Sequence, residues 1–136
     1  MPRNEAGFSL YTRCMSSPKA HAVSWSALDT DHPMPLIERQ RFVGEHMMIS
    51  RVLLSKGFSV PTHEHANEQF AVVLSGAIRF DLGDADDPTS ESTTLGPGDV
   101  LVIPPNAPHA ATAIEDTLIL DCFSPTSETT GVDRNA

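Results

Sequence analysis

Three histidines and one glutamine have the types and spacing of a metal site. His63, His65 and Gln69 lie at positions of the same parity between Gly57 and Gly76, and His109 follows further along the chain. In an extended strand, side chains two positions apart point to the same face, so the first three are expected to face inward together. Three imidazole nitrogens and one amide oxygen inside a barrel would bind one divalent transition metal ion.

Glu68 competes with Gln69 for the position of fourth ligand. Strand alternation directs Glu68 away from the histidines and therefore favours Gln69, although a β-bulge would reverse this assignment. With Gln69 as ligand the protein donors are neutral, so the ion keeps its full charge and acts as a strong Lewis acid. The donor set suits Zn, Ni, Fe(II), Mn or Co and does not choose among them.

Three further residues are candidates for catalysis or substrate binding. Asp121 would transfer protons if it faces the cavity, or else would hydrogen-bond a loop. Phe123 shares the parity of Asp121 and is a candidate to contact the substrate. Arg51 would bind a substrate carboxylate if its side of the strand faces the interior. An exposed or salt-bridged arginine is the commoner case.

Short apolar and alternating segments predict the strands that would position these side chains. The 11 prolines and 8 glycines lie mostly between such segments, as expected for strands joined by turns. The run 100–103 is continuously apolar, which predicts a strand buried on both faces, and the acidic segment 83–92 predicts a hairpin loop. The predicted strands cover residues 37–43, 46–55, 58–74, 77–82, 100–103 and 117–123.

Length and charge limit the classes of function. A chain of 136 residues is expected to form one domain, here residues 21–126, with a flexible arm at 1–20 and a polar tail at 127–136. The net charge of -9 argues against a nucleic-acid partner and against binding to an anionic membrane. Two distant cysteines and the absence of an apolar leader or a long apolar run predict a cytoplasmic protein.

The order and spacing of these residues resemble the two motifs of the cupin superfamily. The first motif is a glycine, two histidines, a fourth ligand and a second glycine, matched here by Gly57, His63, His65, Gln69 and Gly76, with glutamine in place of the usual glutamate. The second motif is matched by Gly98, Pro104 and His109, with Asn106 at a position where cupins have glycine. The resemblance implies an all-β cupin barrel, a double-stranded β-helix or jelly roll, and a homodimer.

One group of small cupins is similar in more detail. The strings HEHANEQ and DCFSP resemble the group that includes polyketide cyclases and the enzyme that linearises unsaturated uronates. In the uronate enzyme an arginine follows the last strand, whereas Ser127 occupies that position here. The carboxylate-binding arginine of that enzyme is therefore missing, unless Arg51 or another residue replaces it.

Three functions are compatible with these features. The first is a metal-dependent, non-redox enzyme, such as an isomerase, tautomerase, cyclase or lyase, acting on a small oxygenated substrate. The second is an Fe(II)-dependent dioxygenase with the same ligands. The third is a module that binds a metal or small ligand without turnover.

Overall fold

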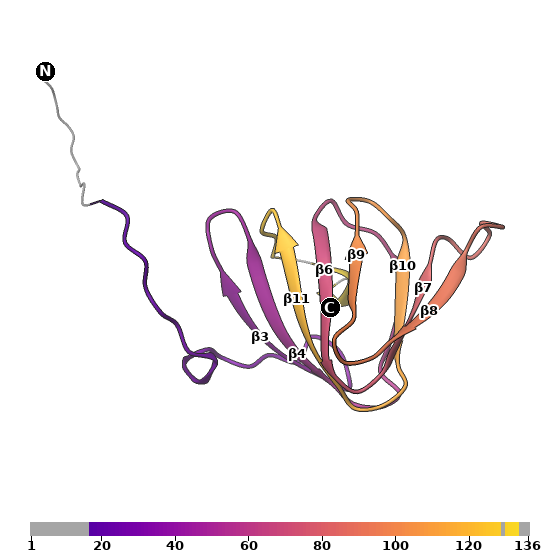
Figure 1. The fold of residues 1–136 in the computed structure, drawn as a ribbon, viewed down its shortest axis with the longest axis horizontal. Coiled ribbons are helices and arrows are strands. Elements are labelled where there is room, and N and C mark those ends of the chain that lie inside the picture. Colours follow the sequence, from indigo (N-terminus) through magenta and orange to yellow (C-terminus); the bar gives the residue numbers. More distant parts are fainter. Residues whose placement is uncertain (1–16, 129, 134–136) are drawn as a thin grey trace, which may run out of the picture.

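The computed structural model describes residues 17–128 and 130–133, which form two antiparallel β-sheets packed face to face (Figure 1). The first sheet has five strands, in the order β3 (Ile37–Val43), β4 (Met48–Leu54), β11 (Thr117–Ser124), β6 (Glu68–Ser75) and β9 (Val100–Ile103). The second has four, in the order β5 (Ser59–His63), β10 (His109–Ala113), β7 (Ile78–Leu82) and β8 (Glu91–Leu95). Two short 3₁₀ turns, η1 (Trp25–Ala27) and η2 (Gly131–Asp133), flank the strands. This nearly all-β arrangement confirms the predicted fold class.

The core lies between the sheets because every strand directs alternate side chains to it. On β6, Gln69, Ala71 and Val73 are buried, whereas Phe70 and Leu74 are exposed, as the alternation predicted. On β4 the buried row is Met48, Ser50, Val52 and Leu54. Apolar residues of both sheets complete the core, among them Ile37, Val60, Ile78, Phe80, Leu95 and Ile119.

Three details of the predicted strands are corrected by the structure. The segment 58–74 is not one strand, since β5 ends at His63 and β6 begins at Glu68. Part of the predicted loop 83–92 and the residues after it form β8, which pairs with β7. The run 100–103 is not buried on both faces, because β9 is an edge strand whose Val100 and Val102 are 51% and 55% exposed.

Two residues with positive φ shape the turns around the barrel. Gly76, between β6 and β7, has φ +90°, and a Cβ there would lie 2.2 Å from the carbonyl oxygen of Asp116. Asn106 has φ 64°, a conformation that asparagine tolerates better than most residues. This explains why asparagine can occupy the glycine position of the second motif.

The part of the tail that the structure describes packs against the barrel. Val132 contacts the hydrophobic core, and Asp133 forms an ion pair with Arg39 on β3. The expectation of a loose tail is therefore wrong for residues 130–133. Most of the predicted N-terminal arm lies outside the described residues; residues 17–20 are exposed and extended beyond the barrel (Figure 1). Across the described ranges, no helix is long and apolar enough to cross a membrane.

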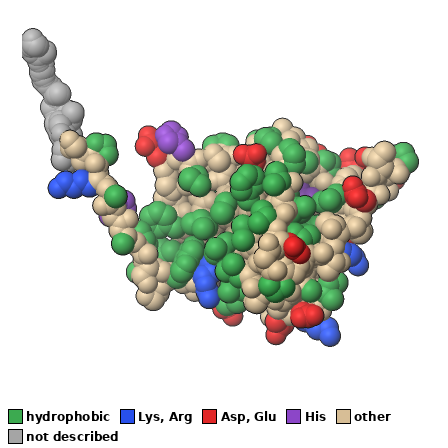
Figure 2. All heavy atoms as spheres, in the orientation of Figure 1, with side chains coloured by type: hydrophobic (Ala, Val, Ile, Leu, Met, Phe, Trp, Pro, Cys, Tyr) green, Lys and Arg blue, Asp and Glu red, His purple; other side chains and the backbone are tan. Residues whose placement is uncertain are grey.

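The outer face of the five-stranded sheet is unusually apolar. Hydrophobic side chains gather over β4, β11, β6 and β9 in the space-filling view (Figure 2). The large exposed members on these strands are Leu53, Phe70, Leu74, Val100 and Val102, which we call the outer apolar face. A monomeric protein rarely exposes a continuous apolar surface of this kind.

Candidate metal centre

The strand ends at one end of the barrel bring together the three predicted histidines. His63 closes β5, His109 opens β10, and the two residues are register partners in the same sheet. His65 lies in the connection between β5 and β6, where its carbonyl oxygen accepts a hydrogen bond from the Asn106 N–H at 2.8 Å. One ligand atom from each histidine lies within 4.8 Å of the others. The broken strand thus still delivers the expected convergence.

Backbone carbonyls fix the orientation of each imidazole. The Nδ1 atoms of His63, His65 and His109 lie 2.8, 3.1 and 2.8 Å from the carbonyl oxygens of Pro61, Asn67 and Ala107, respectively. A carbonyl can only accept a hydrogen bond, so each Nδ1 carries the proton and each neutral ring keeps its lone pair on Nε2. Such outer hydrogen bonds are typical of histidines that bind metals.

Gln69 is held in the same way by Asp121. The side-chain amide N–H of Gln69 donates to Asp121 Oδ1 at 2.9 Å, which turns the Gln69 Oε1 atom toward His65. Oε1 lies 3.1 Å from His65 Nε2. Glu68 is exposed and points away from the histidines, as strand alternation indicated. We call His63, His65, His109 and Gln69 the ligand cluster.

The ligand cluster is compatible with a cation. With Nδ1 protonated, His65 Nε2 is a lone-pair donor, and it faces a second lone-pair donor, Gln69 Oε1, at 3.1 Å. Two such atoms repel unless a proton or a metal ion lies between them. Nitrogen and oxygen donors in this number suit a divalent transition metal ion. The residues present therefore fit the metal that the sequence predicted.

Burial shifts two pKa values at this centre. Burial, together with the neighbouring His63 and His65, lowers the pKa of His109 to about 4, although the hydrogen bond to Ala107 opposes this. His109 is therefore neutral near pH 7, which is the form that binds metals. Desolvation raises the pKa of Asp121 to about 6, and the hydrogen bond from Gln69 only partly offsets it.

A cavity of about 70 Å³ extends from the ligand cluster into the barrel. Asp121 and Phe123 line it, as do Ile78, Phe80 and the small Ala111. Phe123 also contacts His65 edge-on, with ring centroids 5.8 Å apart. The structure thus places Asp121 and Phe123 beside the ligand cluster. Among the described residues, Asp121 Oδ2 has no hydrogen-bond partner.

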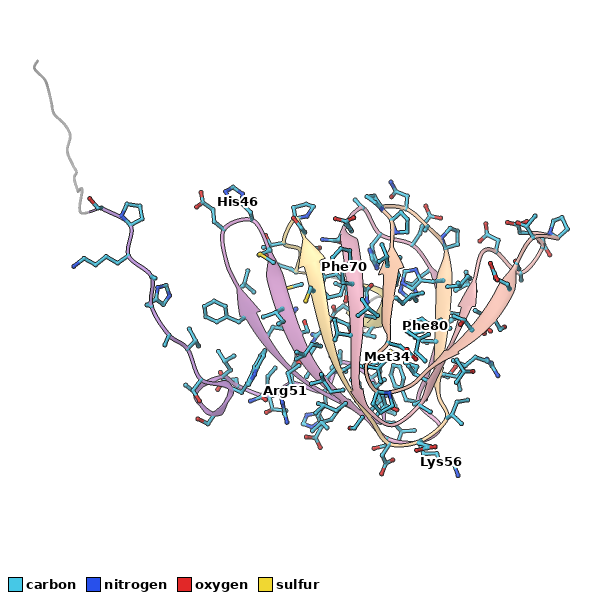
Figure 3. All side chains as sticks on the ribbon, viewed as in Figure 1. Met34, His46, Arg51, Lys56, Phe70 and Phe80 are labelled. Atoms are coloured by element: carbon cyan, nitrogen blue, oxygen red, sulfur yellow. The ribbon has the colours of Figure 1, made fainter. Side chains whose placement is uncertain are left out.

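Arg51 does not reach this cavity. It lies on the outer face of β4, next to the exposed Leu53 and away from the buried row, and Nη1 approaches Gln40 Oε1 at 3.5 Å (Figure 3). The arginine that lines the cavity is Arg39 on β3, which sequence reasoning missed. Its only signal was a shared parity with the apolar Ile37, and alternation does not tell which face is inside. His46 lies on the exposed turn between β3 and β4, away from the other histidines (Figure 3).

Comparisons with known proteins agree with this architecture. The family model described as "Cupin domain" matches residues 50–123. The chain is similar to KdgF from a Halomonas species, with 27% identity, a TM-score of 0.71 and coverage of 81% of this chain and 97% of that one. An RmlC-like cupin from Shewanella frigidimarina has 21% identity and a TM-score of 0.70, covering 81% and 95%. Oxalate decarboxylase from Bacillus subtilis has 21% identity and a TM-score of 0.69, covering 78% of this chain and 30% of its own. No curated protein matches the sequence.

Proposed function

The chain belongs to the cupin family, and on this basis we propose that it is a metal-dependent, non-redox enzyme acting on a small oxygenated substrate. The reaction class is isomerisation or tautomerisation, cyclisation or elimination. The ligand cluster would hold one divalent ion, either Zn, Ni, Fe, Mn or Co. The similarity to KdgF over nearly the full length of that protein supports a small single-domain enzyme of this kind.

One observation carries the proposal. Gln69 Oε1 and His65 Nε2 face each other at 3.1 Å, and separate hydrogen bonds, to Asp121 and to the Asn67 carbonyl, hold both in place. A protein that did not bind a cation here would gain by rotating the amide, so that its N–H group faced the imidazole. The bond to Asp121 opposes that rotation and keeps the oxygen available as a ligand.

The chain's own groups divide the remaining work. When bound, a metal ion in a neutral ligand set would polarise a carbonyl oxygen or lower the pKa of a bound water molecule. Asp121, with its pKa near 6 and Oδ2 free of described partners, can accept or return a proton close to neutral pH. Phe123 and Phe80 line the cavity with apolar surface that excludes water. None of these steps changes the oxidation state of the metal.

Metal analysis of matched histidine variants tests the binding site. We expect near-stoichiometric transition metal in the wild-type protein and its loss in His65→Ala, because the ligand cluster then lacks one nitrogen donor. His46→Ala is the matched control: its side chain is 86% exposed and outside the cluster, so this variant should keep the metal. Equal metal content in both variants would contradict the site.

The reaction class needs a separate measurement. We expect turnover of small hydroxy-carbonyl or oxo compounds, followed by NMR, to stop on chelation and to continue when oxygen is removed. Undiminished turnover by the metal-free protein would contradict metal dependence. Oxygen consumption by an iron-loaded protein would replace the proposal with a dioxygenase.

A further inference from the structure

A buried arginine lies in the wall of the cavity and is not used by the proposed metal chemistry. Arg39 is 4% exposed and lines the same cavity as the ligand cluster. Its guanidinium is bound by two carboxylates, each through two hydrogen bonds. Nε and Nη2 donate to Asp31 at 3.0 and 2.7 Å, and Nη1 and Nη2 donate to Asp133 at 2.9 and 2.8 Å.

The two carboxylates are held in different ways. Asp31 is part of the barrel framework, since its backbone pairs with that of Arg39 through hydrogen bonds of 2.8 and 2.9 Å. Asp133 belongs to η2, and within the described chain its side chain otherwise bonds only to the neighbouring Thr130. Thr130 and Val132 of this segment also line the cavity. The Asp133 carboxylate is therefore brought to Arg39 by a short terminal segment rather than by a strand.

The charges show that one carboxylate is sufficient for Arg39. Arg41 on the same strand also contacts Asp31, with Nη2 at 3.5 Å from Oδ2. Arg39, Arg41, Asp31 and Asp133 together have no net charge, so displacing Asp133 leaves an excess positive charge at the cavity. A guanidinium with two free N–H groups binds a carboxylate through paired hydrogen bonds, as Asp133 does now.

Ser50 provides a second, independent polar group. It is 2% exposed, lines the cavity, and its hydroxyl makes no hydrogen bond with any residue in the described parts of the chain. It lies one inward position along β4 from Val52, the register partner of Arg39. A buried hydroxyl without a partner is costly, and a polar ligand in the cavity would satisfy it.

We propose that Arg39 and Ser50 form a carboxylate-binding subsite of the cavity, and that Asp133 occupies this subsite as an intramolecular competitor until a small carboxylate displaces η2. This inference rests on the proposed function and deepens it, because it names the substrate class as small carboxylic acids. It also assigns the carboxylate-binding role to Arg39, where the sequence had offered Arg51. The 70 Å³ cavity would widen when Thr130 and Val132 leave its wall.

Binding of propionate to the full-length protein tests the proposal, with propionamide as the neutral analogue of the same shape. NMR follows the side-chain Nε–H resonance that is lost in Arg39→Lys. We expect propionate, and not propionamide, to shift this resonance. In Asp133→Asn the dissociation constant for propionate should fall at least about tenfold, because the internal competitor is removed. Asp86→Asn is the charge-matched control, on the exposed loop between β7 and β8, and should bind as the wild type does.

Several results would overturn the proposal. These are an unchanged propionate affinity in Asp133→Asn, equal binding of propionamide, or a resonance of Arg39 that propionate does not move. A chain ending at Glu128 provides a second variant without the carboxylate. If both this chain and Asp133→Asn fail to fold, Asp133 is a structural partner and not a displaceable one. The measurement needs no turnover and no metal analysis, so its failure is distinguishable from failure of the proposed enzyme activity.

Discussion

At the scale of single residues, the hydrogen bond between Asp121 and Gln69 links metal binding to proton transfer. The carboxylate orients the amide oxygen toward His65, and the same carboxylate has a pKa raised to about 6 by desolvation. One side chain would thus serve both as a positioning group and as an acid or base. Substitutions that keep or remove its acceptor oxygen can separate these two roles.

We expect Asp121→Ala to weaken metal binding about 10- to 100-fold, because Gln69 loses the partner that fixes its orientation. Asp121→Asn keeps an oxygen that can accept from Gln69 and should retain the metal. It should nevertheless lose turnover by roughly 10²- to 10⁴-fold, since an amide cannot take up the proton. Competition with a chelating dye and measurement of kcat test both effects. Wild-type metal affinity in Asp121→Ala would contradict the positioning role.

At the scale of elements, the ligand cluster depends on turns that hold the strand ends in place. The connection between β5 and β6 is fixed by the Asn106 N–H at the carbonyl oxygen of His65 and by Asn67, whose side-chain amide donates to the carbonyl oxygen of Pro125 at 2.5 Å. At the opposite end of β6, Gly76 passes against Asp116 and turns the chain from the five-stranded to the four-stranded sheet.

Gly76→Ala should be strongly destabilising, by about 3–5 kcal/mol, because its Cβ would lie 2.2 Å from a backbone oxygen and the residue also has φ +90°. Gly57→Ala is the matched control: φ is +92°, but nothing lies within 4 Å of the added Cβ. Only the backbone strain remains there, which costs about 1–2 kcal/mol. Denaturant unfolding compares the two free energies. Equal losses would show that the contact with Asp116 relaxes.

At the scale of the whole molecule, we propose that two copies of the chain associate through the outer apolar face. Val100 and Val102 lie on the edge strand β9, and Phe70 lies beside them on β6. An unpaired edge next to an exposed apolar surface favours pairing with a second copy. A stable interface buries about 800 Å² on each partner, which a face spanning four strands can supply.

Phe70→Glu should convert the dimer to a monomer in sedimentation velocity, because it places a charge within the outer apolar face. Ile114→Glu makes the same change at a residue of similar exposure, 41% against 43%, in the turn after β10. This control should remain dimeric. A monomeric wild-type protein, or dissociation of both variants alike, would contradict the proposed interface.

Much of the fold and of the metal centre could be predicted from the sequence because both depend on local rules. Period-two alternation in β6 and β11 correctly assigned Gln69 and Asp121 to the inner face and Phe70 to the outer face. The spacing of His63, His65 and His109 predicted their convergence, although a break between β5 and β6 brings it about. These features depend on residue type and separation along the chain, which the sequence states directly.

The tertiary structure alone decided which face of β3, β4 and β9 is interior. Alternation defines two faces but not their neighbours, so Arg51 and Arg39 were equal candidates until packing placed one outside and one in the cavity. The pair formed by Arg39 and Asp133, 94 residues apart, is likewise invisible to any local pattern. The physical reason is that a strand's own residues set its periodicity, whereas burial and pairing are set by distant segments that happen to cover it.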